Sequence, residues 1–194
     1  MYSLGNKIWF TSRTRIQTER RLRSGGWHSQ FILLWYSFFG VAVAVYSSST
    51  SSETQLDSVT WVIYSILILV LSGFLQGSRF GERAAAIKQC YENLQKLLTT
   101  LEQNDIDERT AREKYFEILD SCENHIGADF VEAVCVEWLS STDKSLTRTP
   151  TNYMWFSFAC TRVQRLIWYS LLYSLPAALL LAINFWGRHL ASLG

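Results

Sequence analysis

Charged residues are scarce in this sequence, and long parts of it have none. Asp, Glu, Lys and Arg make up 18% of the 194 residues, and a net charge of +1 gives no general attraction to nucleic acid. Ser24–Ser52, Ser58–Ser78 and Leu166–Gly187 contain none of these four residue types. A soluble bundle would have to bury three such stretches on all sides, and a chain of this size leaves too little polar surface to cover them.

Sequence patterns of common active sites are also missing. The sequence contains no glycine-rich phosphate loop and no nucleophile elbow. Its histidines fall in separate regions, and its cysteines have no CxxC spacing, so we interpret the cysteines as reduced core residues. We therefore expect no enzymatic activity. A lipid-modifying enzyme is a distant alternative, because it would need an activated nucleophile or a metal near the membrane. The three histidines are His28, His125 and His189, and the four cysteines are Cys90, Cys122, Cys135 and Cys160.

Each uncharged stretch contains an apolar segment long enough for a transmembrane helix. About 20 helical residues cross the ~30 Å hydrocarbon layer. The expected spans are Trp27–Tyr46, Thr60–Gln76 and Leu166–Trp186. Pro176 interrupts the backbone hydrogen bonds of the third, which is tolerated where neighbouring groups satisfy the freed carbonyl.

These segments predict an all-α membrane protein. We expect a transmembrane helical hairpin whose second helix extends into a cytoplasmic helical bundle, followed by a C-terminal apolar helix that forms a third span. The expected segments are a basic cytoplasmic N-terminal helix (1–26), the transmembrane hairpin (27–78), a cytoplasmic helical module (79–165) and a C-terminal transmembrane or membrane-associated helix (166–187).

The distribution of positive charge predicts the orientation in the membrane. Loop 47–58 has no base and two acids, whereas residues 1–26 carry six bases and one acid. Lys and Arg favour the cytoplasmic side, so we expect residues 1–26 and 79–165 in the cytoplasm and loop 47–58 outside. We expect five arginines on the membrane surface: Arg13, Arg15, Arg20, Arg21 and Arg23.

The basic N-terminal segment fits two competing roles less well. A cleaved signal peptide is disfavoured because a second apolar run follows the first so closely. A nucleic-acid patch is disfavoured because no aromatic residue is interleaved between Arg13 and Arg23.

The segment between the second and third apolar runs has the periodicity of a helical bundle. Its first helix should continue directly from the second span and fold back on the next as an antiparallel hairpin. Gly127 suits a helix end, and Asp129 suits the N-cap of a third helix. We expect the apolar seams to form the core of this module, with an intermolecular coiled coil as the alternative. The seams are Ala84, Ile87, Tyr91, Leu94, Leu98 and Leu101; Ala111, Tyr115, Ile118 and Cys122; and Phe130, Val134 and Trp138.

Small residues recur at helical spacing where the second span ends. Gly73, Gly77 and Gly81 lie four residues apart, a spacing that lets another helix backbone approach closely. They are expected to pack either against the small residues of the first span or against another subunit, and the pattern fits both. The small residues of the first span are Ser37, Gly40 and Ala44.

Polar side chains inside the spans are few. No ionisable residue lies within them, which argues against a proton relay, a voltage sensor or a carboxylate ion site. Ser65, Ser72 and Gln76 of the second span would line a pore if several chains assembled around an axis. Alternatively, such serines bond their own helix backbone.

Three residues of the cytoplasmic module invite a metal-site interpretation. Glu123, His125 and Asp129 are potential ligands, but they flank a helix end where capping explains them, and no fourth ligand is evident. We expect no metal and no cofactor.

The sequence contains the motifs RTRIQTERRLR, WHSQFILLWYS at the start of the hairpin, YFEILD and CENHIGADF. Together they resemble the SLATT family of two-transmembrane effectors from bacterial conflict systems, and the likeness extends over residues 6–165. It is closest to the branch with an ENH-containing hairpin. The matching positions are Arg20, Arg21 and Leu22 in the basic segment and Glu123, Asn124, His125 and Asp129 in the hairpin. The third apolar segment departs from the two-span pattern.

The resemblance implies an effector of the bacterial inner membrane that acts in anti-phage defence. Such a protein would be triggered by a partner or nucleotide signal, form oligomers, and open pores in the membrane or disrupt it. Its expected partners are the lipid bilayer, copies of itself and a sensor or signal-producing protein from a neighbouring gene, without direct nucleic-acid binding. The competing hypothesis is a non-conducting anchor or scaffold that recruits a soluble defence enzyme.

Overall fold

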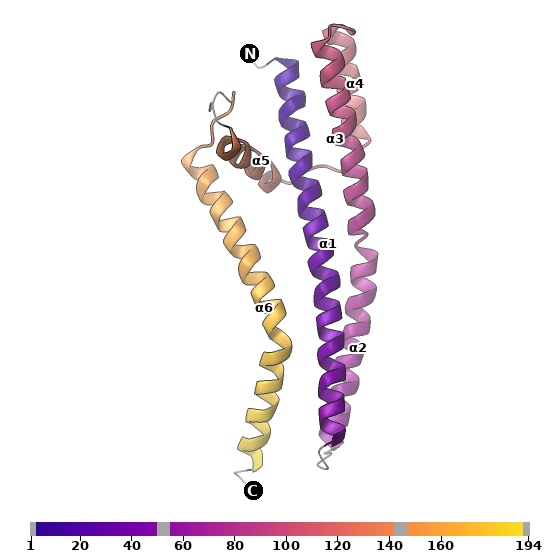
Figure 1. Cartoon of the computed structure of the whole chain (residues 1–194), viewed down its shortest axis with the longest axis vertical. Helices are drawn as coiled ribbons and strands as arrows, with labels where there is room; N and C mark the ends of the chain where they lie inside the picture. Colours follow the sequence, from indigo (N-terminus) through magenta and orange to yellow (C-terminus); the bar gives the residue numbers. More distant parts are fainter. Residues whose placement is uncertain (1–2, 50–54, 142–146, 192–194) are drawn as a thin grey trace. The chain divides into compact units, whose positions relative to one another are not determined.

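Helices are the only regular secondary structure in the described residues. A computed structural model describes residues 3–49, 55–141 and 147–191, and these ranges contain six α-helices and no strand (Figure 1). The all-α prediction is therefore confirmed. The helices are α1 (Leu4–Ser49), α2 (Gln55–Gly77), α3 (Phe80–Glu102), α4 (Glu108–Asp120), α5 (Gly127–Ser140) and α6 (Asn152–Ala191).

The chain divides into two compact units, each built from segments far apart in sequence. The first, here called the polar unit, combines Met1–Gly26 with Arg79–Val163. The second, the apolar unit, combines Trp27–Ser78 with Gln164–Gly194. The basic N-terminal segment is thus grouped with residues 79–163.

The helix is interrupted between α2 and α3, although the chain is continuous. Arg79 adopts a left-handed conformation (φ 45°, ψ 39°), which a non-glycine residue enters only at a cost and which does not continue a right-handed helix. The amide of Ser78 closes α2 with 3.2 Å bonds to the carbonyls of Phe74 and Leu75. The expected direct extension of the second span is therefore wrong in this detail, and Gly81 lies on α3 rather than on the helix of Gly73.

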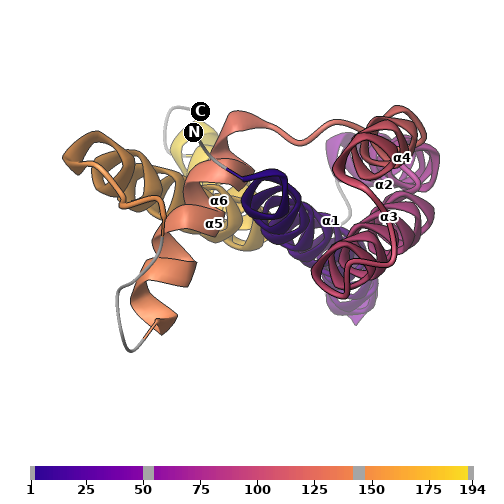
Figure 2. The ribbon, with the colours of Figure 1, turned by 90° about the horizontal axis from the view of Figure 1, so that it is seen from above.

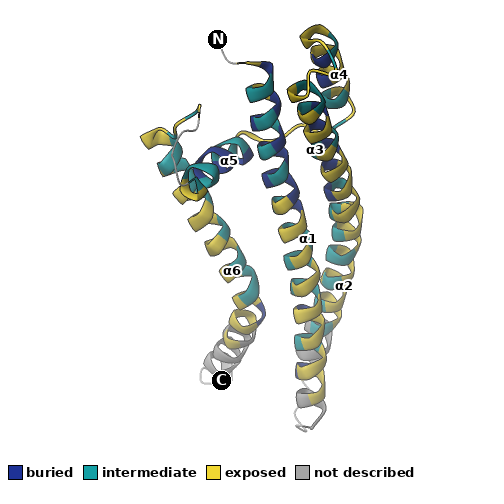
Figure 3. Cartoon of the chain, turned by 45° about the horizontal axis from the view of Figure 1, so that its top comes forward, coloured by how far each residue is buried: buried dark blue, intermediate teal, exposed yellow. Residues whose placement is uncertain are grey.

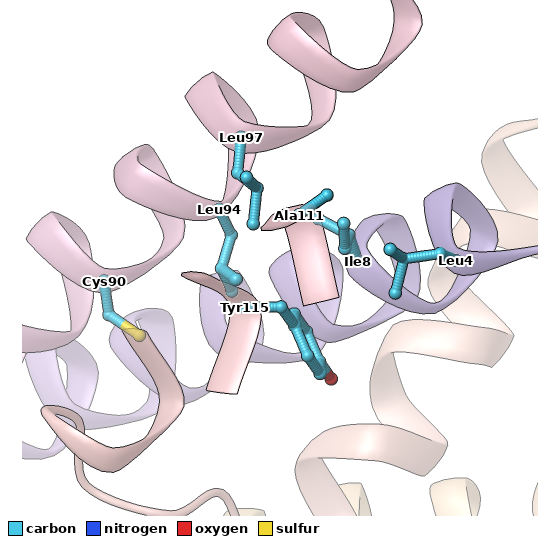
Figure 4. Packing of buried hydrophobic residues seen from close by; sticks show 7 residues of the cluster. All are labelled: Leu4, Ile8, Cys90, Leu94, Leu97, Ala111 and Tyr115. Carbon is cyan, nitrogen blue, oxygen red and sulfur yellow. The ribbon is translucent and has the colours of Figure 1, made fainter. Parts of the chain in front are cut away.

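The polar unit has an apolar core between the start of α1 and the hairpin of α3 and α4. These two helices lie side by side in both ribbon views (Figures 1 and 2), joined by a turn in which Asn104 has φ 59°. Asp107 caps α4 by accepting from the amide of Thr110 (3.4 Å). The predicted hairpin and its internal core are confirmed. Figure 4 shows the buried cluster of Leu4, Ile8, Cys90, Leu94, Leu97, Ala111 and Tyr115.

In contrast, the apolar unit exposes most of its large hydrophobic side chains. In the part of α2 with described side chains, exposed residues cover most of the helix surface (Figure 3). Water would solvate such a surface poorly, whereas lipid chains solvate it well. The exposed residues of α1 and α2 include Trp27, Phe31, Leu34, Phe38, Val41, Val45, Val62, Ile63, Ile66, Leu67, Leu69, Val70 and Phe74.

Two helical stretches are long and apolar enough to cross a membrane. They lie within Leu4–Val45 and Trp61–Glu102, and they correspond to the first two predicted spans. The search covered the described residues alone, and the side chains of residues 182–191 at the end of α6 lie outside them. The expected loop 47–58 is shorter than predicted, since α1 reaches Ser49 and α2 begins at Gln55, and residues 50–54 lie outside the description.

Candidate functional site

The centre of the polar unit is a buried carboxylate. Asp129 is completely buried in the first turn of α5. Its Oδ1 accepts from Arg21 Nε (2.8 Å), and its Oδ2 accepts from Arg21 Nη2 (3.1 Å) and Thr18 Oγ1 (3.0 Å). The amide of Ile126 also donates to Oδ2 (3.3 Å). These four donors satisfy a carboxylate that burial would otherwise penalise.

This geometry corrects two expectations about the start of α5. Gly127 begins the helix instead of ending one, and the N-cap is Ile126 instead of Asp129. Asp129 caps from the third position inside the helix, because its carboxylate reaches back to the Ile126 amide. The side chain thereby fixes the start of α5 and also ties α5 to α1.

A second arginine of α1 is buried in the same unit. Arg15 is only 1% exposed, and its Nε and Nη1 have no hydrogen-bond partner among the described residues. Burial lowers the pKa of Arg15, although Tyr115, Glu123 and Asp129 act in the opposite direction. This stretch of α1 is unusually polar for a buried part of a helix. Its buried polar residues are Ser12, Thr14, Arg15, Gln17, Thr18 and Glu19.

The predicted membrane-surface role is therefore wrong for two of the five arginines. Arg15 lies inside the polar unit, and Arg21 binds the buried Asp129. Arg23 pairs with Glu19 on the same helix (2.6 Å), and Arg13 lies 3.5 Å from Glu137. Arg20 is exposed. The charge count identified the basic segment correctly, but it could not show that some of these arginines pair with acids of α5.

A second ion pair holds the connection between α4 and α5. Arg83 of α3 donates to both oxygens of Glu123, through Nε at 2.9 Å and through Nη2. Both side chains are more than 40% exposed. The bond from Arg83 lowers the pKa of Glu123 and raises that of Arg83. Asn124 and His125 are exposed on the same connection.

The hairpin signature residues therefore do not converge on one cation site. Glu123 is held by Arg83, whereas Asp129 is held by Arg21. Across the described ranges, no group of three or more His, Cys, Asp or Glu side chains is placed to hold a metal ion. The arrangement is suited to joining α1, α3 and α5 through charge.

A disulfide was not expected from the sequence. Cys90 of α3 is bonded to Cys122, which directly precedes Glu123, so the reduced interpretation is wrong for this pair. Cys135 is a buried free thiol and Cys160 an exposed one. The sequence did place Cys122 on the apolar seam that was expected to pack against α3, and this could have suggested a cysteine of α3 as its partner. Without a CxxC motif, that signal did not identify its partner.

In the apolar unit, a tyrosine of α2 packs directly on α1 at Gly40. A Cβ at Gly40 would lie 2.8 Å from Tyr64 Cε1, closer than real contacts permit. The Tyr64 hydroxyl donates to the carbonyl of Tyr36 (2.8 Å), one turn before Gly40 on α1. Gly40 therefore makes room for the Tyr64 ring of α2. It does not pack against the glycines of α2.

The spaced glycines at the end of the second span do not contact α1. At Gly73, Gly77 and Gly81, an added Cβ would meet no other described atom within 4 Å. Ser37 and Ala44 of the first span are exposed. The expected alternative, in which these glycines pack against Ser37, Gly40 and Ala44, is therefore wrong for this structure.

Aromatic donors of α1 hold α6 at its proline. Tyr36 Oη donates to the carbonyl of Leu172 (2.8 Å), and Trp35 Nε1 donates to that of Tyr173 (3.2 Å). Pro176 has no N–H for the Leu172 carbonyl four residues earlier, so the Tyr36 hydroxyl takes its place. His28 adds a 3.0 Å bond between Nδ1 and the Tyr173 hydroxyl. Sequence reasoning identified the need for such donors but not the residues.

The polar side chains of α2 share one face. Ser65 donates to the carbonyl of Trp61 (2.9 Å), as expected for a serine that bonds its own helix. Ser72 is half-buried and Gln76 is exposed. At about 100° per residue, Ser65, Ser72 and Gln76 lie within about 40° of one another around α2. They form a narrow polar stripe on α2, which is otherwise apolar between Trp61 and Gly77.

Together, the exposed apolar helices and the charge-linked helical unit define an all-α membrane protein. The chain belongs to the SMODS and SLOG-associating 2TM effector domain family 5, whose model matches residues 1–183. It is therefore a membrane effector of the defence systems to which this family belongs. The narrower likeness to an ENH-containing branch stays a prediction. No curated protein and no solved structure matches the chain.

Proposed function

We propose that this effector self-associates through α2 and makes the bacterial inner membrane permeable. The observation that carries the proposal is the uncovered face around Gly73 and Gly77, since no described atom approaches a Cβ built at either residue. Two small residues four apart on an apolar helix allow close contact between helix backbones in lipid. Such contact supplies dispersion energy and needs no catalytic chemistry.

The geometry of α2 supports contact with a second copy. Tyr64, which packs on α1, lies nine residues before Gly73, so the two residues point about 180° apart around the helix. The same helix can therefore hold α1 on one side and another subunit on the other. The stripe of Ser65, Ser72 and Gln76 lies about 60–100° to one side of Gly73 and would face the centre of a ring of subunits.

The triggering signal is proposed to act on the polar unit, with residues 1–26 and 79–165 in the cytoplasm. A ligand or partner shifts a conformational equilibrium only through different affinities for the two states. It must therefore bind this unit or a protein attached to it. The proposed source is the product of a neighbouring gene, as the family resemblance implies.

Dye release from liposomes tests the proposal. Purified protein would be placed in vesicles of phosphatidylethanolamine and phosphatidylglycerol, with and without the neighbouring gene product. Gly73→Ile combined with Gly77→Ile should weaken self-association by about 1–3 kcal/mol and reduce release accordingly. Gly81→Ile is the matched control, because that glycine is equally open but lies on α3.

Two outcomes would contradict the proposal. An unchanged oligomer distribution in the double variant would remove α2 as the interface. Absence of release under every stimulus, with oligomers intact, would support the competing hypothesis of a non-conducting anchor.

A further inference from the structure

Arg15 is a buried cation, and none of the described carboxylates forms an ion pair with it. Two of its guanidinium nitrogens lack a hydrogen-bond partner in the described part of the chain, and the residue is 1% exposed. Arginine is almost never fully buried unless it is paired. A second state in which Arg15 does have a partner would explain why the polar unit contains this residue.

Two carboxylates of the polar unit attract Arg15 electrostatically, and each is bonded to another arginine. Asp129 binds Arg21, and Glu123 binds Arg83. Both act electrostatically on Arg15, as does Tyr115, whose hydroxyl is bonded to Thr11 Oγ1 (3.0 Å). Neither acid is within ion-pair distance of Arg15 in this structure, and one of them would have to leave its present arginine to pair with it.

The two acids differ in how firmly they are held. Asp129 is fully buried on α5 and accepts four bonds, so moving it would break the start of that helix. Glu123 is exposed and lies on the non-helical connection between α4 and α5. An exposed ion pair contributes little to stability, so Glu123 can leave Arg83 at low cost.

We propose that Glu123 is a two-position switch, bound to Arg83 of α3 in this structure and to Arg15 of α1 in a second state. The exchange turns the Glu123 side chain from α3 toward α1, the helix that also enters the apolar unit, while the disulfide keeps Cys122 bonded to α3. It gives Arg15 a counter-charge and leaves the exposed Arg83 free to bind another anionic group. This device does not depend on how the apolar unit affects the membrane.

Amide hydrogen exchange over residues 121–126 tests the switch in the full-length, detergent-solubilised protein. In Arg83→Gln, Glu123 should pass to Arg15, so exchange of this segment should stay at or below the wild-type rate. In Arg83→Gln combined with Arg15→Gln, Glu123 has neither partner, and exchange should rise by about two- to fivefold. Arg15→Met alone should raise the thermal midpoint by about 3 °C or more, because it removes an unpaired buried charge.

A fixed ion pair would behave differently. If Arg83→Gln accelerates exchange equally with and without Arg15, Glu123 has one position and the proposal is wrong. Should the Arg15 variants fail to fold, Glu123→Gln combined with Arg83→Gln replaces them. That protein must exchange faster than Arg83→Gln alone, and equal rates would overturn the switch.

Discussion

The hydroxyl group of Tyr36 on α1 donates a 2.8 Å hydrogen bond to the carbonyl oxygen of Leu172 on α6. That carbonyl lies four residues before Pro176, where an ordinary helix would supply an N–H. The same tyrosine offers its own carbonyl to the hydroxyl of Tyr64 on α2 (2.8 Å). One residue of α1 therefore joins three helices of the apolar unit.

Tyr36→Phe should loosen the contact between α1 and α6. It leaves the Leu172 carbonyl without its donor, and hydrogen bonds inside membrane bundles contribute about 0.6 kcal/mol on average and up to about 1.7 kcal/mol. We expect a loss of about 1 kcal/mol in the free energy of unfolding, measured by denaturation in bicelles. Tyr153→Phe, at an exposed tyrosine of α6, is the control and should have no effect.

Pro176→Ala provides the stricter test of the same bond. The substitution restores an N–H that can satisfy the Leu172 carbonyl within α6, so the Tyr36 hydroxyl becomes redundant. The loss caused by Tyr36→Phe should therefore shrink in the Pro176→Ala background. An equal loss in both backgrounds would mean that the hydroxyl does not compensate for the proline.

Gly40→Ala should separate a glycine that is needed from one that is not. A Cβ at Gly40 meets the ring of Tyr64 at 2.8 Å, and that ring is fixed by its bond to Tyr36. We expect destabilisation of about 1–3 kcal/mol, typical of overpacking. Gly81→Ala, in open space on α3, should be neutral or slightly stabilising because alanine favours the helix. Equal thermal midpoints for the two variants in detergent would contradict the assigned contact.

Elements dominated by simple hydrophobic pattern could be predicted from the sequence. The uncharged stretches identify the first two spans, because no other feature so easily produces twenty apolar residues in a row. The spacing of Ala84, Ile87 and Leu94 predicts the buried face of α3 for the same reason. Both signals are local and need no knowledge of which helix packs on which.

Features that depend on long-range pairing could not be predicted. Arg15 and Arg21 have the same chemistry as Arg20, and only the packing of other segments against α1 decides how far each of them is exposed. The break after α2 was also hidden, since Arg79 is not a residue that usually adopts φ near 45°. The partner of Cys122 is 32 residues away on another helix, without any motif to indicate it.

The Cys90–Cys122 disulfide should make the stability of the polar unit depend on redox conditions. For a separation of 32 residues, chain-entropy estimates give about 3.5 kcal/mol of stabilisation as an upper value. We expect a reductant to lower the thermal midpoint of the wild type, and Cys90→Ser to reproduce that lower value without further response to reductant. Cys160→Ser, at an exposed free thiol, should respond like the wild type.

The redox prediction also bears on the proposed orientation. Thiols of bacterial cytoplasmic proteins are kept reduced, so a polar unit on that side would contain Cys90 and Cys122 as thiols in the cell. Alkylation of intact cells before lysis would show which form is present. A thermal midpoint that is indifferent to reductant would mean that the bond contributes nothing to the unit.

Asp129→Asn should strongly destabilise the polar unit. The amide keeps one acceptor oxygen, but its NH2 group faces donors, and the half-buried Arg21 loses its counter-charge. Breaking a buried ion pair costs about 3–5 kcal/mol, and we expect about 2–3 kcal/mol here because Arg21 still reaches solvent. Such a loss lowers the thermal midpoint by roughly 5–10 °C for a chain of this size. Asp105→Asn, the same change at an exposed turn residue, should leave the midpoint unchanged. If the two variants have the same thermal midpoint, Asp129 does not anchor α5 to α1.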